Sequence, residues 1–115
     1  MTYCVAMNLD AGMIFASDSR TNAGVDQISR FSKMRIFHRD GDRVIVVLSS
    51  GNLSITQNAI STMEQRVRGD EHAPNMMNVP SMFDVARLLG DALREVKARD
   101  GPYLMQNNVD SGANF

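Results

Sequence analysis

The spacing of apolar positions predicts two β-hairpins in the first 48 residues. Between residues 2 and 9, larger apolar or aromatic side chains alternate with smaller or polar ones, which is the pattern of a strand with two different faces. A turn composition at 10–12 and a second short apolar run at 13–16 complete the first hairpin. We expect a second hairpin from strands at 33–37 and 44–48.

The second strand of this hairpin and the segment before the hairpin differ in character. Residues 44–48 form a continuous run of β-branched and aliphatic residues, as expected of a strand buried on both faces. Residues 19–32 are polar and contain Asn22-Ala23-Gly24, so they are predicted to form a loop.

After residue 51 the apolar spacing changes to three and four, which predicts an amphipathic helix from about 52 to 68. Its expected buried stripe is Leu53, Thr56, Ile60, Met63 and Val67. A polar loop with two prolines should follow at 69–80. A second helix is then predicted to begin at Ser81, a suitable N-cap, and to end near Asp100, before the stop signal Gly101-Pro102. Its expected buried stripe is Met82, Val85, Leu89, Leu93 and Val96.

The resulting order, ββββαα, is an α+β pattern without an internal repeat or a long linker. One core is the natural expectation for 115 residues, so residues 1–115 are interpreted as a single domain or part of one. The strand at 44–48 needs cover on both faces and further strands beside it. The predicted elements do not supply enough cover and neighbouring strands, so the fold is expected to require additional sequence.

Composition removes several classes of function. The chain is 43% apolar and 22% charged, with a formal net charge of −1, which gives no footprint for nucleic acid or an anionic membrane. No apolar run reaches the roughly 20 residues that span a bilayer, and no signal-peptide pattern opens the chain, so a cytoplasmic protein is expected. The single Cys4 and the separated His38 and His72 predict neither a disulfide nor a metal site.

Candidate chemistry begins at Thr2. A small second residue normally permits removal of Met1, and the mature chain would then begin with threonine. Such a residue carries a hydroxyl nucleophile together with an α-amine of pKa about 7.7–8.0, which can act as its general base. Taken alone, Thr2 is better explained as the first residue of a strand, because threonine at position 2 is common in proteins without such chemistry.

Four segments favour the catalytic interpretation of Thr2 over the structural one: 2–6, Gly12 to Arg20, 22–24 and 33–36. Together they resemble the opening of proteasome-type β subunits, which are N-terminal nucleophile hydrolases, and most closely the bacterial ancestral beta subunit branch. The resemblance implies that Thr2 is the nucleophile, that Lys33 is the cation that eases deprotonation of its hydroxyl, and that Asp18 holds this lysine. An ammonium near a hydroxyl favours the oxyanion, so the roles are physically consistent. Without the resemblance, Asp18 and Lys33 would be interpreted as an ion pair joining the ends of a loop.

Two further residues take roles from the resemblance. Gly51 corresponds to the glycine whose backbone N–H forms the oxyanion hole, although a plain glycine before a helix is the alternative. Asn22 stands where the family commonly has threonine, in a loop that binds extended substrates mainly through backbone hydrogen bonds. The loop from Asp18 to Lys33 is one residue shorter than in many β subunits.

The resemblance implies the N-terminal half of a four-layer αββα sandwich with antiparallel sheets. It also implies a threonine-type peptidase subunit without a cofactor or metal, which acts on peptide or unfolded protein substrates and assembles into a ring or spiral. Two alternatives remain open. The chain could be a non-catalytic assembly subunit of a proteasome-like particle, or an amidase that uses the same nucleophile on small amides.

Overall fold

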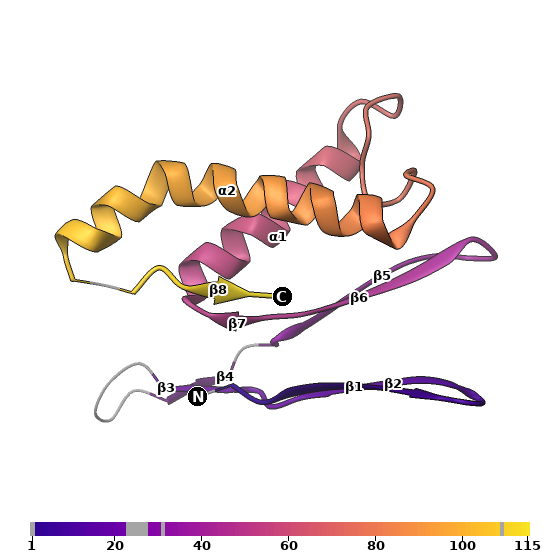
Figure 1. The fold of residues 1–115 in the computed structure, drawn as a ribbon, viewed down its shortest axis with the longest axis horizontal. Helices are drawn as coiled ribbons and strands as arrows, with labels where there is room; N and C mark the ends of the chain where they lie inside the picture. Colours follow the sequence, from indigo (N-terminus) through magenta and orange to yellow (C-terminus); the bar gives the residue numbers. More distant parts are fainter. Residues whose placement is uncertain (1, 23–27, 31, 109) are drawn as a thin grey trace. The chain divides into compact units, whose positions relative to one another are not determined.

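The computed structural model describes residues 2–22, 28–30, 32–108 and 110–115, shown as a ribbon in Figure 1. The chain divides into two compact units, one of residues 1–51 with 114–115 and the other of residues 52–113. The first unit holds strands β1 to β7, and the second holds both helices. The architecture is therefore α+β with antiparallel pairs, as the sequence predicted.

The N-terminal hairpin is confirmed. Strands β1 (Cys4–Leu9) and β2 (Gly12–Ser17) pair antiparallel, from Cys4 opposite Ser17 to Leu9 opposite Gly12. Gly12 has a φ of +143°, a backbone conformation that favours glycine and that explains its place where the turn enters β2. The hairpin brings the end of β2 back beside the first residues of the chain.

The second hairpin is also confirmed, but its burial differs from the prediction. Strands β5 (Met34–Arg39) and β6 (Arg43–Leu48) pair antiparallel around a turn in which Gly41 has a φ of +72°. Ile45 is 5% exposed, whereas its neighbour Val44 is 66% exposed. Successive side chains of a strand point to opposite faces, so the prediction that β6 is buried on both faces is wrong for this chain.

The predicted loop at 19–32 contains short strands. Strands β3 (Arg20–Asn22) and β4 (Ile28–Arg30) pair antiparallel, with Asn22 opposite Ile28, and residues 23–27 lie outside the described residues. Because backbone hydrogen bonds form this pairing, polar side chains do not prevent it, and apolar spacing could not predict it. Two more strands, of two residues each, are β7 (Ser50–Gly51) and β8 (Ala113–Asn114).

In the second unit, helix α1 (Leu53–Arg68) begins where the sequence predicted. The Asn52 side chain caps it by accepting the backbone N–H of Ile55 at 3.1 Å. The buried stripe is displaced from the predicted one, since Ile55 and Ala59 are fully buried while Leu53 and Val67 are only half-buried. Thr56, Ile60 and Met63 are buried as expected.

The connection at 69–80 is irregular, as predicted, but it is not only a polar loop. The Asn75 carboxamide oxygen accepts the N–H of Met77 at 2.8 Å, and the Asn78 oxygen accepts the N–H of Asn75 at 2.8 Å. These bonds fix the backbone so that three apolar side chains are turned into the core, namely Met76, Met77 and Val79. The loop therefore supplies part of the hydrophobic core of this unit.

Helix α2 (Met82–Gln106) is longer than predicted. Ser81 caps it, as expected, by accepting the N–H of Asp84 at 3.3 Å. The helix nevertheless continues through Pro102, so the predicted end near Asp100 is wrong. A proline removes one backbone donor without necessarily ending a helix. Asn107 closes the last turn instead, with its side-chain amide donating to the carbonyl of Tyr103 at 2.8 Å.

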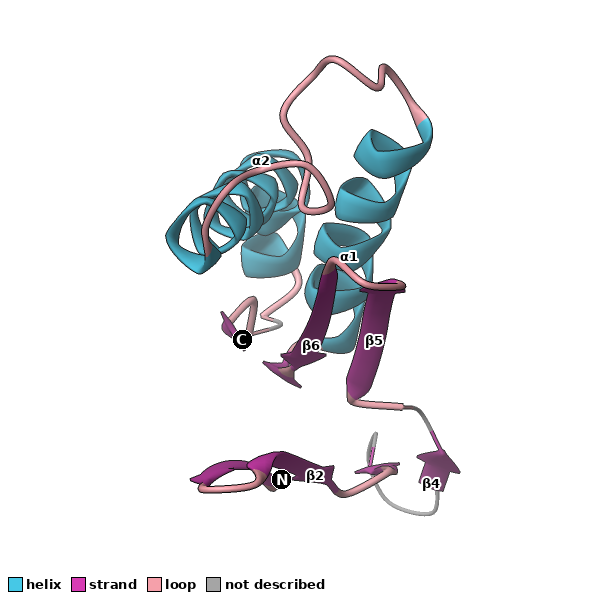
Figure 2. Ribbon diagram, turned by 90° about the vertical axis from the view of Figure 1, so that its right-hand side faces the viewer, coloured by secondary structure: helices cyan, strands magenta, loops and turns pink. Residues whose placement is uncertain are grey.

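The two helices pack against each other in a pair joined by the 69–80 loop (Figure 2). From α2 the buried residues are Val85, Ala92 and Val96, whereas Met82 is 64% exposed, contrary to its predicted place in the stripe. An ion pair between Arg66 and Glu95, at 2.8 Å, links the two helices at their surface. Among the described residues, neither helix is long and apolar enough to cross a membrane.

Candidate active site

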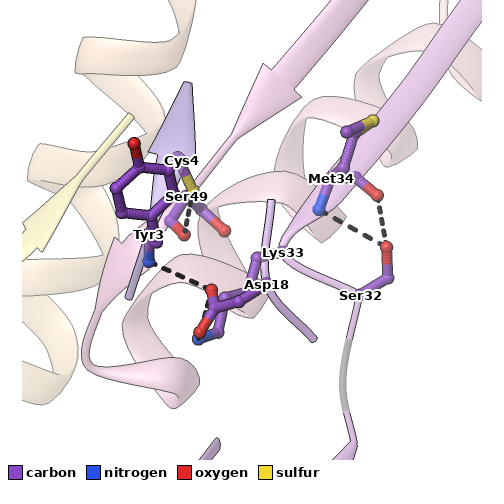
Figure 3. Close-up of polar contacts among 7 residues, drawn as sticks. All are labelled: Tyr3, Cys4, Asp18, Ser32, Lys33, Met34 and Ser49. Carbon is purple, nitrogen blue, oxygen red and sulfur yellow. Dashed lines mark hydrogen bonds and ion pairs between the residues drawn. The ribbon is translucent and has the colours of Figure 1, made fainter. Parts of the chain in front are cut away.

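Asp18 and Lys33 form an ion pair at the junction of the two hairpins of the first unit. Asp18 directly follows β2 and Lys33 directly precedes β5, so the chain brings together two residues that are fifteen positions apart (Figure 3). The Lys33 ammonium lies 2.9 Å from one carboxylate oxygen of Asp18 and 3.0 Å from the other. The lysine side chain is 8% exposed and that of Asp18 is 37% exposed. Both predicted residues thus meet in a partly buried pair.

The same contacts determine the charge of Asp18. Its pKa is held below the ordinary value first by the hydrogen bond from Lys33 and then by the backbone N–H of Tyr3. Asp18 is therefore a carboxylate at neutral pH. An ionised, hydrogen-bonded carboxylate restrains the position of the buried ammonium, because charge-assisted hydrogen bonds are the stronger kind.

The residue that follows Thr2 is attached to this pair. The backbone N–H of Tyr3 donates to the Asp18 carboxylate at 3.1 Å, and the carbonyl of Tyr3 accepts the backbone N–H of Asp18 at 3.0 Å. Thr2 itself is half-buried. Consecutive Cα atoms are about 3.8 Å apart. The Cα atom of Thr2 therefore lies at about that distance from the Cα atom of Tyr3, whose N–H binds the carboxylate.

Ser49 is a neighbour of the pair that the sequence reasoning did not identify. Its backbone N–H donates to the carbonyl of Lys33 at 2.9 Å, and its own carbonyl accepts a hydrogen bond from the Cys4 thiol at 3.7 Å. Ser49 is 6% exposed. These contacts connect the start of β1, the start of β5 and the end of β6. The only hint in the sequence was its place directly after the apolar strand.

For the remaining two predicted site residues, Gly51 and Asn22, the structure gives the position in the fold but does not test the role. Gly51 lies in β7, directly before the capping residue Asn52, and its φ of +104° is one that favours glycine. The predicted junction between a strand and a helix is confirmed there. Asn22 lies at the end of β3. The assignments of Gly51 to an oxyanion hole and of Asn22 to substrate binding stay predictions.

Of the side-chain types that commonly bind metals, Asp18 and Cys4 lie at this site. Within the described ranges, no group of three such residues could hold a metal ion. His38 and His72 are both exposed.

The two antiparallel hairpins and the two helices are together those of the N-terminal half of a proteasome-type N-terminal nucleophile hydrolase. Within that class, the chain belongs to the Anbu family, the ancestral beta-subunits. No protein-family model and no curated protein matches the chain. Solved structures do match it.

Anbu from Yersinia bercovieri is 50% identical, with a TM-score of 0.79 over 88% of this chain and 42% of that one. The Anbu complex from Pseudomonas aeruginosa, which forms a helical assembly, is 42% identical, with a TM-score of 0.85 over 98% of this chain and 45% of that one. An Anbu mutant from Hyphomicrobium sp. strain MC1 is 40% identical, with a TM-score of 0.79 over 88% and 43%. The chain therefore spans less than half the length of these structures.

The predicted resemblance to the ancestral beta subunit branch of proteasome-type hydrolases is confirmed by these matches. The chain corresponds to the N-terminal half of the Anbu fold, and the predicted fold class is confirmed with it. That residues 1–115 form a single partial domain stays a prediction.

Proposed function

We propose that this chain provides the nucleophile of a threonine-type peptidase subunit, with Thr2 as the attacking residue once Met1 is removed. The observation that carries the proposal is the partly buried Asp18–Lys33 pair, whose carboxylate also binds the backbone of the residue after Thr2. The similarity to Anbu supports the class of protein. Peptide or unfolded protein chains are the proposed substrates.

In the proposed reaction, the Thr2 hydroxyl attacks the carbonyl carbon of a peptide bond and its proton passes to the α-amine of the same residue. Lys33, held by Asp18, lowers the energy of the developing alkoxide through its positive charge. The tetrahedral oxyanion accepts a hydrogen bond from the N–H of Gly51. Collapse releases the amine product, which takes the proton, and leaves an ester on Thr2. A water molecule then hydrolyses this ester and restores the hydroxyl.

Asn22 and the paired backbone of β3 are proposed to bind the substrate by strand addition, in which an extended peptide forms hydrogen bonds with the main chain. This mode places few demands on side chains. An asparagine in place of threonine therefore leaves backbone binding possible and changes only the contacts that a side chain makes.

Self-assembly is the second part of the proposal. The Anbu complex from Pseudomonas aeruginosa forms a helical assembly, and we propose that this chain also assembles with copies of itself. The β1–β2 hairpin leaves several large apolar side chains exposed, including Met7, Met13 and Ile14 at 48%, 56% and 53%. Met7 and Ile14 lie opposite each other in the hairpin and share one face, and exposed apolar side chains grouped in this way are typical of protein contacts.

Covalent labelling tests the catalytic proposal. Intact mass spectrometry first establishes whether Met1 is absent, because a retained Met1 leaves no free α-amine on Thr2 and would overturn the proposal. The chain is then treated with a peptide electrophile that reacts with an N-terminal threonine. We expect labelling of the wild type, none of Thr2→Ala, and a loss of at least about a hundredfold in rate for Lys33→Ala, in keeping with the range for removing a group that stabilises developing negative charge.

Lys97→Ala is the matched control, since Lys97 is the other lysine of the chain and lies in α2 of the second unit. Its labelling rate should equal that of the wild type. A chain that has lost Met1 and still resists labelling would refute catalysis by Thr2 and would leave the non-catalytic assembly subunit as the better explanation. Labelling by small amide-like electrophiles alone would favour the amidase.

A further inference from the structure

The Asp18 carboxylate makes two kinds of contact at once. Its Oδ1 atom accepts hydrogen bonds from the Lys33 ammonium at 2.9 Å and from the backbone N–H of Tyr3 at 3.1 Å, while Oδ2 accepts a second bond from Lys33 at 3.0 Å (Figure 3). One oxygen atom therefore touches both the buried cation and the main chain at the beginning of the protein.

The bond to Tyr3 restrains more than Tyr3 itself. A peptide group is planar, and the plane that contains the N–H of Tyr3 also contains the Cα atom of Thr2. On the other side of residue 3, the carbonyl of Tyr3 accepts the backbone N–H of Asp18 at 3.0 Å. Asp18 thus holds both peptide groups of residue 3, and through the first of them it restrains the position of Thr2.

Lys33 is restrained by contacts of both its side chain and its backbone. Its side chain is 8% exposed and is bound by both oxygens of Asp18, and its carbonyl accepts the backbone N–H of Ser49 at 2.9 Å. The same carboxylate therefore holds both the cation and the peptide group between Thr2 and Tyr3. A change in that carboxylate would move both.

We infer that Asp18 is a positioning residue for Thr2, because its carboxylate fixes the peptide group after Thr2 at a set place relative to the Lys33 ammonium. This role is additional to restraining and charging Lys33, and it rests on the proposed function of Thr2. Displacement of a reacting group by about 1 Å can reduce a rate about a hundredfold. The positioning contact should therefore affect the chemistry even where the charge of Lys33 is absent.

Substitutions at Asp18 separate the two roles. Asp18→Asn keeps an oxygen that can accept the N–H of Tyr3 but removes the negative charge, whereas Asp18→Ala removes both. In a Lys33→Ala background there is no ammonium to hold, so any difference between Asp18→Asn and Asp18→Ala in that background reports the contact with Tyr3.

The first measurement is the solvent exchange rate of the Tyr3 amide proton by nuclear magnetic resonance. We expect wild-type protection in Asp18→Asn and Lys33→Ala, and exchange at least about tenfold faster in Asp18→Ala, as for an amide that has lost its acceptor. The amides that pair β5 with β6 serve as the folding control, because this hairpin belongs to the same unit as Tyr3. Wild-type exchange of Tyr3 in Asp18→Ala, with those amides still protected, would overturn the inference.

The second measurement is the rate of labelling of Thr2. We expect the double variant Asp18→Ala with Lys33→Ala to react at least about tenfold more slowly than Lys33→Ala alone, and Asn at position 18 to restore the rate of the single variant. Equal rates for the Ala double variant and Lys33→Ala would mean that Asp18 acts only through the lysine. If the wild type is not labelled, the proposed function fails while the exchange of the Tyr3 amide still decides whether Asp18 holds this peptide group.

Discussion

A comparison of two methionines tests whether the 69–80 loop is part of the hydrophobic core. Met76 in the loop is 2% exposed, whereas Met105 in the last turn of α2 is 77% exposed. Both belong to the second unit, and each can be replaced by alanine. The substitutions remove the same atoms, so their difference reports burial rather than chemistry.

The size of the effect follows from the burial of each side chain. Replacing a buried methionine by alanine costs about 2–5 kcal/mol, which combines the lost transfer free energy with about 24 cal/mol for each Å³ of cavity that remains. At Met105 the expected change in the free energy of unfolding is within about 0.5 kcal/mol, as for exposed positions in general. Alanine also has a slightly higher helix propensity than methionine, which offsets part of any loss at Met105.

The assay is urea unfolding followed by far-ultraviolet circular dichroism at the helical band. Both helices, α1 and α2, lie in the second unit, so this signal follows the unit that contains Met76 and Met105. With a slope of about 2 kcal/mol per molar urea, Met76→Ala should lower the midpoint by at least about 1 M. Met105→Ala should leave the midpoint almost unchanged.

Two results would refute this reasoning. Equal midpoints for Met76→Ala and Met105→Ala would show that the loop is not packed into the core as the structure has it. A large loss at Met105 would show that its side chain is covered rather than exposed. A conservative Met76→Leu variant should lose less than about 1.5 kcal/mol, because it nearly conserves the buried volume.

Three further expectations concern single residues. Asn52→Ala should lower the free energy of unfolding by about 1–2 kcal/mol, because the Asn52 side chain both caps α1 and donates to the carbonyl of Asp110 at 2.8 Å. Asn52→Ser keeps the cap and should lose less stability in the same urea assay. An equal loss in the two variants would contradict the capping role. The lowered pKa of Asp18 means that its contribution to stability is present above the unfolded value of about 3.9 and is lost as the pH falls through the lower folded value. A carboxyl titration by nuclear magnetic resonance should give a midpoint below that value, and Lys33→Met should raise it; an unchanged midpoint would exclude Lys33 as the main cause. Pro102→Ala should raise the unfolding free energy by up to about 3 kcal/mol, since it restores a backbone donor inside α2, and a destabilised variant would show that the proline ring itself is needed.

Prediction from the sequence succeeded where the determining interactions are local. Residues 4–17 and 34–48 carry both the strand spacing and the turn residues that define a hairpin, and Ser81, the predicted cap, stands directly before the helix that it begins. The pair of Asp18 and Lys33 was identified through its likeness to a known pattern. Their separation of fifteen positions in the sequence does not by itself show that the two side chains meet.

The errors arise where the pattern of side-chain types does not contain the interactions that decide strand pairing, burial or a helix end. The short strands β3 and β4 pair through the backbone, which side-chain spacing does not report. The stop signal at Pro102 does not end α2, because one missing donor is tolerated and Asn107 closes the helix. Ser49 contacts Lys33 and Cys4 only because three strand ends meet.

The sequence by itself determined the order of the main strands and helices, the positions of the turns and of the Ser81 cap, and the likeness to the Anbu branch, because each depends on residue types at short and fixed spacing. Only the tertiary structure decided that Asp18 binds Lys33 and the backbone after Thr2 together, that Met76 is in the core, and that Val44 is exposed. These are properties of surfaces brought together by folding. They depend on what lies opposite each side chain, which no local pattern contains.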